Sequence, residues 1–259
     1  MRFCSLGSGS GGNGTLIEAS QGITQTRLLV DCGFSLREAT RRLARAGCEP
    51  QEVDAIFITH EHGDHAGCAL ALSARHRIPL FTSRGTWRAI GREDFDPSLL
   101  HLLRSGEEQA FGDLLLQPFA VPHDAEEPLQ LRVGDGSRRL GLITDIGSLT
   151  AAVVAALQGC DALLLECNHD EELLRGSSYP ASLKRRILGT HGHLSNTSAA
   201  ELLAHCRHDR LRHVVAAHLS ASNNTPALAT AALAPILGCS AADIPVADQA
   251  LGLDWLSLG

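Results

Sequence analysis

Lysine and aromatic residues are scarce in this 259-residue chain. Lys184 is the only lysine, so arginine carries nearly all of the positive charge, and the formal net charge is −7. That balance excludes a protein held to nucleic acid by bulk positive charge, although a local basic patch could still bind it. Aromatic residues make up only 4% of the chain, which argues against an aromatic stacking platform for single strands.

Membrane segments, disulfide motifs and long linkers are also missing. No apolar run approaches the ~20 residues of a membrane span, and the amino-terminal sequence has no apolar signal region, so we expect a cytoplasmic protein without membrane contacts. The eight cysteines include no C-x-x-C pair, which favours buried, reduced thiols over a disulfide framework or a cysteine-rich zinc site. Because no Pro/Gly/Ser linker divides the chain, residues 1–259 are expected to form a single domain.

Short apolar runs alternate with helical patterns along the sequence. The expected strands are Arg2–Leu6, Thr15–Ala19, Arg27–Val30, Asp54–Thr59, Pro79–Thr82, Leu114–Val121, Leu129–Val133, Arg139–Thr144, Ala162–Glu166, Leu211–Ala217 and Leu253–Leu258. The expected helices are Ser35–Ala46, Ala66–Arg77, Leu149–Gln158, one that begins at the capping box Ser198–Glu201, and Pro226–Leu237. This order predicts an α/β fold of four layers, an αβ/βα sandwich in which helices cover two central sheets.

The densest chemical signal directly follows the strand expected at 54–59. It reads His-Glu-His-Gly-Asp-His, and its ligand-type side chains are His60, His62, Asp64 and His65. His60 and His62 are two apart on extended backbone and therefore point the same way. Three histidines and two acids after an apolar strand have little packing purpose, so the motif predicts a metal site rather than a solvated polar loop.

Three more ligand-type residues follow apolar strands in the second half of the chain. His123 comes after AVP, Asp145 after RLGLIT, and His218 after HVVAA. Any one of them alone would be an ordinary hydrogen-bonded residue at a strand end. Their recurrence in the same context is how a site is built at one edge of a sheet.

The order H-x-H-x-D-H, His, Asp, His resembles the metallo-β-lactamase superfamily. The resemblance implies a first metal ion held by His60, His62 and His123. It implies a second ion held by Asp64, His65 and His218, with Asp145 as the bridge between the two. Asp31, in LLVDCG, matches an early aspartate that supports the metal loop in this superfamily. Because all of these ligands are nitrogen or oxygen, the expected cofactors are two divalent ions of Zn, Mn or Fe.

Longer stretches resemble one subfamily, YycJ/WalJ. The matching stretches are FCSLGSGSGGNGTLI, THEHGDHAGC, VPHDA, ECNHD, YPASLKRRIL, GHLSN and HLSASNN. Members of that subfamily are described as DNA exonucleases that work from the 5′ end, with manganese as a metal. The resemblance therefore implies a metal-dependent phosphodiesterase with DNA as its substrate, an exonuclease acting from the 5′ end through a hydroxide that bridges two metal ions.

The last third of the chain also resembles ribonuclease Z. The corresponding residues are Glu166, His193-Leu-Ser195 and His218-Leu-Ser220. Phosphodiester hydrolysis needs a proton for the leaving alkoxide, and His193 could supply it with Glu166 orienting the ring. Asp64 could receive the proton of the attacking water. The alternative for His193 is an ordinary loop residue at a helix start capped by Ser195 or Ser198.

Small polar and basic residues near these motifs are candidates for phosphate binding. The candidates are Ser8, Ser10, Asn13, Lys184 and Ser195. The stretch Gly7–Gly12 satisfies G-x-G-x-x-G, but a strand rather than a helix follows it, so a dinucleotide site is rejected. A tight turn is the alternative explanation of that stretch. For the triplet Lys184–Arg186 the alternative is a solvated face.

Two other functional classes remain open. The same dinuclear site could hydrolyse a small molecule, as a lactonase, a thioesterase or a cyclic phosphodiesterase, because this scaffold hosts many chemistries. A non-catalytic regulator is disfavoured by the complete ligand set. The space between Asp145 and His218 is too short for the extra domain found in RNA-processing relatives. The sequence carries no signal about oligomeric state.

Overall fold

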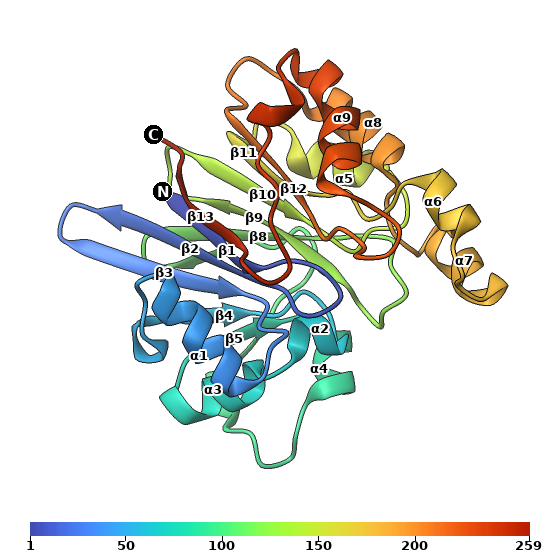
Figure 1. Cartoon of the computed structure of the whole chain (residues 1–259). Helices are drawn as coiled ribbons and strands as arrows, with labels where there is room; N and C mark the ends of the chain where they lie inside the picture. Colours follow the sequence, from blue (N-terminus) through green and yellow to red (C-terminus); the bar gives the residue numbers. More distant parts are fainter.

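The computed structural model describes residues 1–259, and two β-sheets face each other between layers of helices (Figure 1). The strands of the first sheet, in spatial order, are β13 (Leu253–Ser257), β1 (Arg2–Gly7), β2 (Gly14–Gln21), β3 (Thr24–Val30), β4 (Ala55–Phe57), β5 (Leu80–Thr82) and β6 (Leu100–Leu102). Those of the second sheet are β12 (His213–Ala217), β11 (Ala162–Glu166), β10 (Arg139–Ile143), β9 (Leu129–Gly134), β8 (Leu114–Ala120) and β7 (Gln109–Phe111). This α/β sandwich confirms the fold expected from the sequence.

Helices cover the outer face of each sheet. Those beside the first sheet are α1 (Leu36–Arg45), α2 (Gly63–Ala66), α3 (Ala69–His76) and α4 (Arg84–Ile90). Those beside the second sheet are α5 (Ala151–Leu157), α8 (Asn196–Cys206) and α9 (Pro226–Leu237). Two further helices, α6 (Glu171–Gly176) and α7 (Ala181–Ile187), stand out together at one side of the molecule (Figure 1). None of these helices combines the length and apolar character needed to cross a bilayer.

Alternating side chains along each strand serve two different cores. In β3, Leu28 packs between the two sheets while Leu29 packs against the helices of the first sheet. In β11, Leu164 packs between the sheets while Leu163 and Leu165 face the helices of the second sheet. Because both faces of these strands are buried, they read as continuous apolar runs. Burial of one such side chain contributes about 1.5–3 kcal/mol to stability.

Parallel strands bring distant residues to one edge of the sandwich. β3 pairs in parallel with β4, and β11 pairs in parallel with both β10 and β12. The residues at or just beyond the carboxyl ends of these strands are Asp31, His60, Asp145, Glu166 and His218. A crevice outside the carboxyl ends of parallel strands is where open α/β sheets place ligand sites. The topology therefore explains why ligand-type residues follow strand after strand in the sequence.

Two local predictions are wrong. The single helix expected over Ala66–Arg77 is broken at Gly67, which has φ 31° and whose Cβ, if present, would lie 2.4 Å from the Cys32 carbonyl oxygen. The capping box expected at Ser198 is absent because α8 begins three residues earlier, with the Ser195 hydroxyl accepting from the Ser198 backbone N–H. The hairpin of α6 and α7 was not predicted from the sequence, because these helices are only six and seven residues long.

All eight cysteines are free thiols, as the sequence predicts. Seven of them are buried, and Cys239 alone is exposed. The buried thiols therefore act as small apolar side chains in the cores.

Candidate active site

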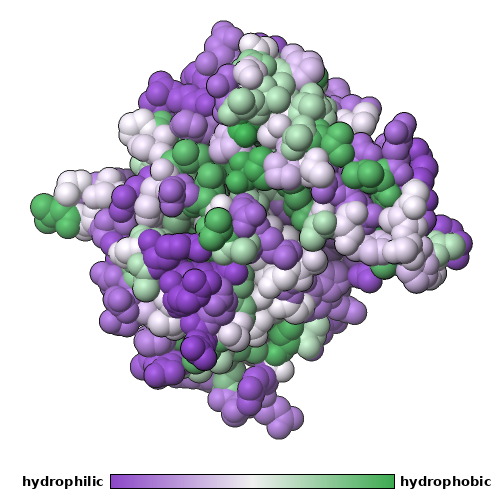
Figure 2. Space-filling view, viewed as in Figure 1, coloured by the Kyte–Doolittle hydropathy of each residue, from purple (hydrophilic) through white to green (hydrophobic).

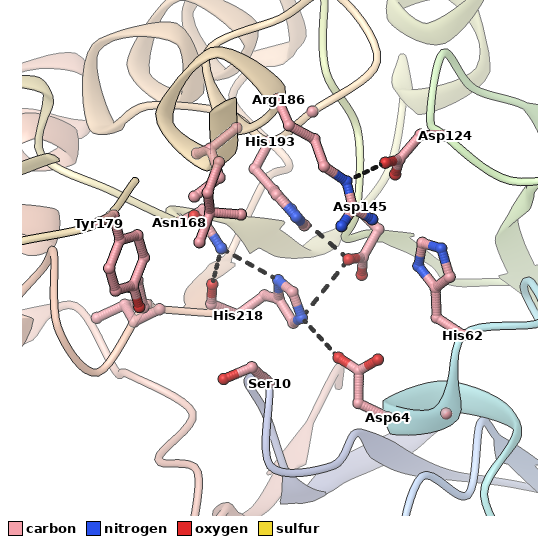
Figure 3. Close-up of a pocket in the computed structure, with 16 residues that line it drawn as sticks. Ser10, His62, Asp64, Asp124, Asp145, Asn168, Tyr179, Arg186, His193 and His218 are labelled. Carbon is pink, nitrogen blue, oxygen red and sulfur yellow. Dashed lines mark hydrogen bonds and ion pairs between the residues drawn. The ribbon is translucent and has the colours of Figure 1, made fainter. Parts of the chain in front are cut away.

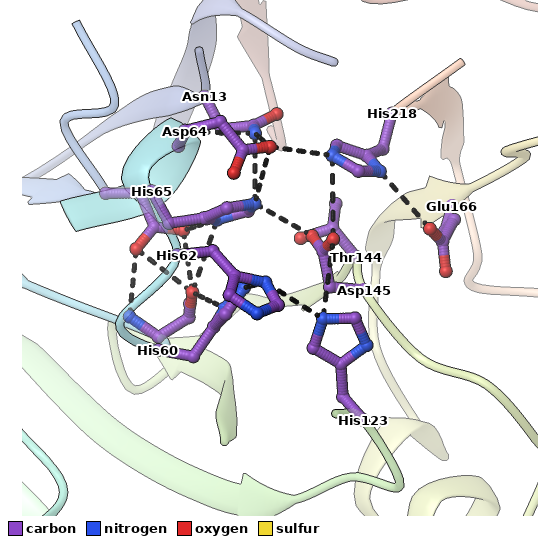
Figure 4. Close-up of polar contacts among 12 residues, drawn as sticks. Asn13, His60, His62, Asp64, His65, His123, Thr144, Asp145, Glu166 and His218 are labelled. Carbon is purple, nitrogen blue, oxygen red and sulfur yellow. Dashed lines mark hydrogen bonds and ion pairs between the residues drawn. The ribbon is translucent and has the colours of Figure 1, made fainter. Parts of the chain in front are cut away.

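Unusual backbone conformations mark the candidate site. Only four residues other than glycine have a positive φ, and three of them are Asp31 (60°), Asp145 (51°) and His218 (55°). The fourth, Arg77, ends α3. Left-handed backbone at a residue with a side chain costs about 1–3 kcal/mol and persists only where the surroundings impose it. Two of these turns direct Asp145 and His218 from strand ends toward one another (Figure 4). Asp31 lies behind the histidine loop, against His65.

Asp31 organises the histidine loop. Its Oδ1 accepts from the Thr59 backbone N–H at 2.8 Å, and its Oδ2 accepts from Nδ1–H of His65 at 2.8 Å. The loop also packs backbone to backbone against the residues after Asp31, since a Cβ on Gly33 would lie 1.7 Å from the Asp64 carbonyl oxygen. Asp31 therefore sets both the position of the loop and the tautomer of His65, as the superfamily resemblance implies.

Hydrogen bonds to one ring nitrogen decide which nitrogen each histidine presents to the centre. The Nδ1–H of His60 donates to Thr59 Oγ1 at 3.0 Å, and that of His123 donates to the Gly192 carbonyl at 3.1 Å. Both histidines therefore present Nε2. His62 differs, because its Nδ1 lies 3.0 Å from His60 Nε2 and 3.4 Å from His123 Nε2. Its Nδ1 is thus the nitrogen that faces the centre.

The ligand-type atoms form two adjoining groups that could each hold a cation. Ligand atoms of His60, His62 and His123 lie within 4.8 Å of one another, and so do those of Asp64, His65 and His218. Asp145 lies between the groups, with Oδ2 3.0 Å from His65 Nε2 of the second group and Oδ1 3.9 Å from His123 Nε2 of the first. The side chains of both groups and Asp145 are drawn in Figure 4, and they are the ones that the superfamily resemblance implies as ligands. Two further sets of ligand atoms also come within 4.8 Å: His60, His65 and Asp145, and Asp145, Glu166, His193 and His218.

Two buried atoms at the centre lack the partners that burial demands. His218 Nε2 is buried and takes part in no hydrogen bond, and the only close polar neighbour of buried Asp145 Oδ2 is His65 Nε2, which belongs to the same candidate ligand set. Buried polar atoms without partners are rare in native proteins, and a bound ion is one accepted reason for them. A cation between Asp145 and His218 would satisfy both atoms. The His/Asp cluster is therefore able to bind metal ions.

The protonation states of the cluster suit metal binding. Burial lowers the pKa of His60 and of His123, which keeps both imidazoles neutral and leaves a lone pair for a cation. Burial opposes the charge of Asp145, but the neighbouring His218 and His65 outweigh it and hold the pKa of this carboxyl well below its ordinary value. The first group thus offers neutral nitrogen donors beside an ionised central carboxylate. In the second group burial lowers the pKa of His65 and of His218, but Asp145 raises it by more, so both rings hold a proton that a bound cation would displace.

Glu166 and His193 form a pair beside the cluster. The Nδ1–H of His193 donates to Glu166 Oε1 at 2.7 Å, while Glu166 Oε2 accepts from the backbone N–H of Ile146 and of Leu194. Burial raises the pKa of Glu166, but the charge of His193 lowers it by more, to about 2. His193 lies at the wall of the cleft, and no protein group bonds to its Nε2 (Figure 3). A fixed carboxylate behind an open imidazole is an arrangement suited to proton transfer.

Two of the candidate phosphate-binding residues hold the ligands in place instead of facing the cleft. The Ser8 hydroxyl accepts from the His218 backbone N–H at 2.8 Å. The Asn13 amide donates to the Asp64 carbonyl at 3.1 Å and lies 3.0 Å from His65 Nε2. Both side chains are buried. Ser10, in contrast, lines the cleft and stays a candidate for contact with substrate (Figure 3).

The other two candidates have partners elsewhere. Ser195 is the N-cap of α8, and Lys184 Nζ donates to the carbonyl oxygens of Arg175 and Ser177, each at 2.7 Å. Neither residue lines the cleft. From the basic triplet it is Arg186 that lines the cleft.

The cleft above the cluster has a volume of about 430 Å³, and it contains Asp124, Asn168 and Tyr179, which the sequence did not single out (Figure 3). Arg186 and Asp124 form an ion pair on one side, and Tyr179 lies on the other. Asn168 donates to the His218 carbonyl at 3.1 Å. The sequence contained features that could have drawn attention to two of these cleft residues. Tyr179 is the only tyrosine, and Asp124 directly follows the candidate ligand His123.

Replacing Asp31 with asparagine is expected to weaken metal binding about 10- to 100-fold. The amide would present an N–H group to Nδ1 of His65, so that nitrogen could no longer donate and Nε2 would lose its fixed lone pair. Competition with a chromophoric chelator measures the affinity. Asp54→Asn, at the opposite end of β4 where the carboxylate accepts from the Arg27 N–H, is the matched control. Unchanged affinity in Asp31→Asn would refute this role.

The sequence from residue 26 to residue 218 matches the beta-lactamase superfamily domain. The match spans most of the chain and includes every ligand candidate. The protein therefore belongs to the beta-lactamase superfamily.

Within this superfamily, the chain is similar to two named exodeoxyribonucleases. The chain is 35% identical over 232 residues to exodeoxyribonuclease WalJ of Streptococcus pneumoniae, covering 88% of this chain and 85% of the relative. It is 34% identical over 241 residues to exodeoxyribonuclease YycJ of Bacillus anthracis, covering 92% and 89%. These matches confirm the subfamily resemblance of the sequence motifs.

Solved structures agree on the fold. The metallo-β-lactamase fold protein YhfI of Bacillus subtilis has a TM-score of 0.74 at 14% identity, over 98% of both chains. The short form of human tRNase Z has a TM-score of 0.67 at 18% identity over the full length of both chains. At such identities the likeness establishes the architecture alone.

Proposed function

We propose that this protein is a metal-dependent exodeoxyribonuclease that hydrolyses DNA from the 5′ end. The observation that carries the proposal is the Glu166–His193 pair, 2.7 Å apart, at the wall of a cleft floored by the candidate metal ligands. Metal clusters of this type serve many substrates, but a placed proton donor is needed above all for a poor leaving group such as an alkoxide. The names of the relatives from S. pneumoniae and B. anthracis support DNA as the substrate.

The proposal assigns two divalent ions, of Zn, Mn or Fe, to the cluster. His60, His62 and His123 would hold the first ion. Asp64, His65 and His218 would hold the second, and Asp145 would bridge both. When bound, these ions supply an activated water and neutralise charge on the scissile phosphate.

The side chains of the protein have separate tasks in this reaction. The Asp64 carboxylate, one-quarter exposed toward the cleft, takes up the proton lost by the attacking water. His193 holds a proton at Nε2 and delivers it to the leaving oxygen. Glu166 accepts from Nδ1–H of His193, so its charge stabilises the protonated ring. Glu166 Oε1 also lies 3.2 Å from His218 Nδ1, which couples the proton donor to the metal cluster.

Digestion of end-labelled oligonucleotides tests the proposal. Single- and double-stranded DNA and RNA, labelled at the 5′ or the 3′ end, are incubated with the protein loaded with Mn²⁺ or Zn²⁺. We expect labelled mononucleotide to be released first from 5′-labelled DNA, and no release after chelation of the metal. Internal cleavage, preference for RNA, or turnover of a lactone or thioester without any cleavage of DNA would overturn the proposal. The cytoplasmic location stays a prediction from the sequence.

A further inference from the structure

One continuous segment supplies the cleft with its only arginine or lysine and its only aromatic ring other than histidine. The residues of this segment that line the cleft are Tyr179, Leu183, Arg186 and Ile187. The rest of the lining contains three carboxylates and several histidines but no lysine or arginine. A nucleotide offers a negative phosphate and a flat apolar base, so this segment has the two complementary features that the remainder of the cleft lacks.

The spacing along α7 explains why these side chains face the cleft together. Leu183, Arg186 and Ile187 stand at i, i+3 and i+4 and therefore share one face of the helix. Lys184 points away, with its ammonium group bound to carbonyl oxygens at the end of α6. The hairpin of α6 and α7 projects beside the body of the molecule (Figure 1), and its surface carries apolar as well as polar side chains (Figure 2), with Leu173 and Leu188 exposed. Leu183 and Ile187 are the apolar residues of α7 that line the cleft.

The segment is tied to the reacting groups. The His193 backbone N–H donates to the Ile187 carbonyl at 3.0 Å, and a Cβ on Gly192 would lie 2.2 Å from the same oxygen. The Nε of Arg186 pairs with Asp124, whose other carboxylate oxygen lies 3.4 Å from Nε2 of His123. Both contacts fix the wall of the cleft relative to the proton donor and to the first ligand group.

Arg186 retains donors for a substrate. Its Nε is used by Asp124, whereas neither of its Nη atoms bonds to the protein. Figure 3 shows the guanidinium above His193 and Asp145, on the same side of the cleft as Asp124. A guanidinium with free, forked N–H groups matches the oxygens of a phosphate.

Tyr179 lies across the cleft from His62, with His218 and Asp145 between them (Figure 3). Its side chain is only partly buried and lines the cleft. The cleft, at about 430 Å³, is within the range of pockets that take one small molecule, about 300–1,000 Å³. One nucleotide fits such a volume, and a length of duplex does not.

We infer that residues 179–187 form the subsite for the terminal nucleotide of a DNA strand, in which Tyr179 packs against the terminal base and Arg186 contacts its phosphate. This inference rests on the proposed exonuclease function and extends it, because a walled cleft that admits one nucleotide selects a strand end over an internal linkage. The apolar side chains of Leu183 and Ile187 complete the wall next to the ring.

The first test removes the aromatic ring of Tyr179 from the protein and, separately, the terminal base from the DNA. Tyr179→Ala should raise KM for 5′-terminal DNA about 5- to 150-fold with a smaller effect on kcat, and Tyr179→Phe, which keeps the ring, should restore most of the affinity. An oligonucleotide with an abasic 5′-terminal position should show a similar loss with the unaltered protein and no further loss with Tyr179→Ala. Leu173→Ala, on the exposed side of α6, is the matched control and should behave as the unaltered protein. Equal losses on intact and abasic ends, or an unchanged KM, would overturn the subsite.

The second test does not depend on DNA cleavage. Calorimetry with the metal-loaded protein measures binding of deoxyadenosine and of its 5′-monophosphate. Tyr179→Ala should weaken both ligands, whereas Arg186→Ala should weaken only the monophosphate, by at least about tenfold. If DNA is not cleaved but this pattern is found, the exonuclease proposal fails and the nucleotide subsite stands. If neither variant alters binding, the subsite fails even if DNA is cleaved.

Discussion

Replacing Asp64 with alanine is expected to lower phosphodiesterase turnover on the order of 10³-fold or more, with the fold largely intact. The carboxylate belongs to the group with His65 and His218, and its Oδ2 lies 3.7 Å from the facing nitrogen of each. Its removal takes away a metal ligand and the acceptor for the proton of the attacking water. The side chain is one-quarter exposed toward the cleft, so truncation leaves no cavity in the core.

Turnover on DNA at saturating metal, metal content by mass spectrometry and the thermal unfolding midpoint are measured together. Asp94→Ala provides the control, since that carboxylate pairs with Arg92 on the surface and its side chain is 73% exposed. We expect the control to match the unaltered protein in all three measurements. Near-normal turnover of Asp64→Ala at saturating metal would refute the catalytic role of Asp64.

The second large effect concerns proton donation by His193. His193→Ala should lower the rate on DNA by about 10²–10⁴-fold, since the leaving alkoxide then lacks its general acid. Hydrolysis of bis-p-nitrophenyl phosphate should fall far less, because nitrophenolate leaves without a proton. Metal content should not change, since His193 is not assigned as a ligand. His205→Ala, in the exposed part of α8, is the matched control.

Each departure from this pattern has a definite meaning. Equal losses on both substrates would contradict proton donation and leave His193 with phosphate binding only. Loss of a metal ion would show that His193 is a ligand, in line with its position in the group formed by Asp145, Glu166 and His218. Full activity of His193→Ala on both substrates would show that His193 has no role in the reaction.

The dependence of kcat on pH in Glu166→Gln tests independently whether His193 is the general acid. Burial lowers the pKa of His193, but the charge of Glu166 raises it by more. A general acid works below its pKa, so activity on DNA is lost as the pH rises through that value. Without the charge of Glu166 the pKa falls, and the alkaline limb of kcat should move to lower pH. If the alkaline limb of the kcat profile does not shift, Glu166 does not set the pKa of the general acid.

The polar residues at strand ends and the layered arrangement of sheets and helices could be predicted, because both follow from short-range sequence patterns. The apolar runs that precede Asp31, Asp145 and His218 identify strands, and a polar residue just beyond such a run can only lie at a sheet edge. Two-residue periodicity places His60 and His62 on the same side. The metallo-β-lactamase motif then relates these edges to one another, and the observed ligand groups agree with it.

Helix boundaries near the site were harder to predict because tertiary contacts set them. The break at Gly67 exists because the loop after α2 packs against the Cys32 carbonyl, a residue 35 positions away. The start of α8 at Ser195 was one of two caps allowed by the sequence, and the bond from the Ser198 N–H selects it. Local propensity could not distinguish these alternatives.

The superfamily motif in the sequence predicted the candidate ligand residues, the order in which strands deliver them, and His193 as the candidate acid. Only the tertiary structure decided which neighbouring side chains face the cleft. Lys184 and Arg186 are equivalent in a basic triplet, yet α7 turns Arg186 toward the metal cluster and Lys184 toward the end of α6. The physical reason is that a helix rotates successive residues by about 100°, so the face toward the cleft depends on how α7 packs, which no local pattern records.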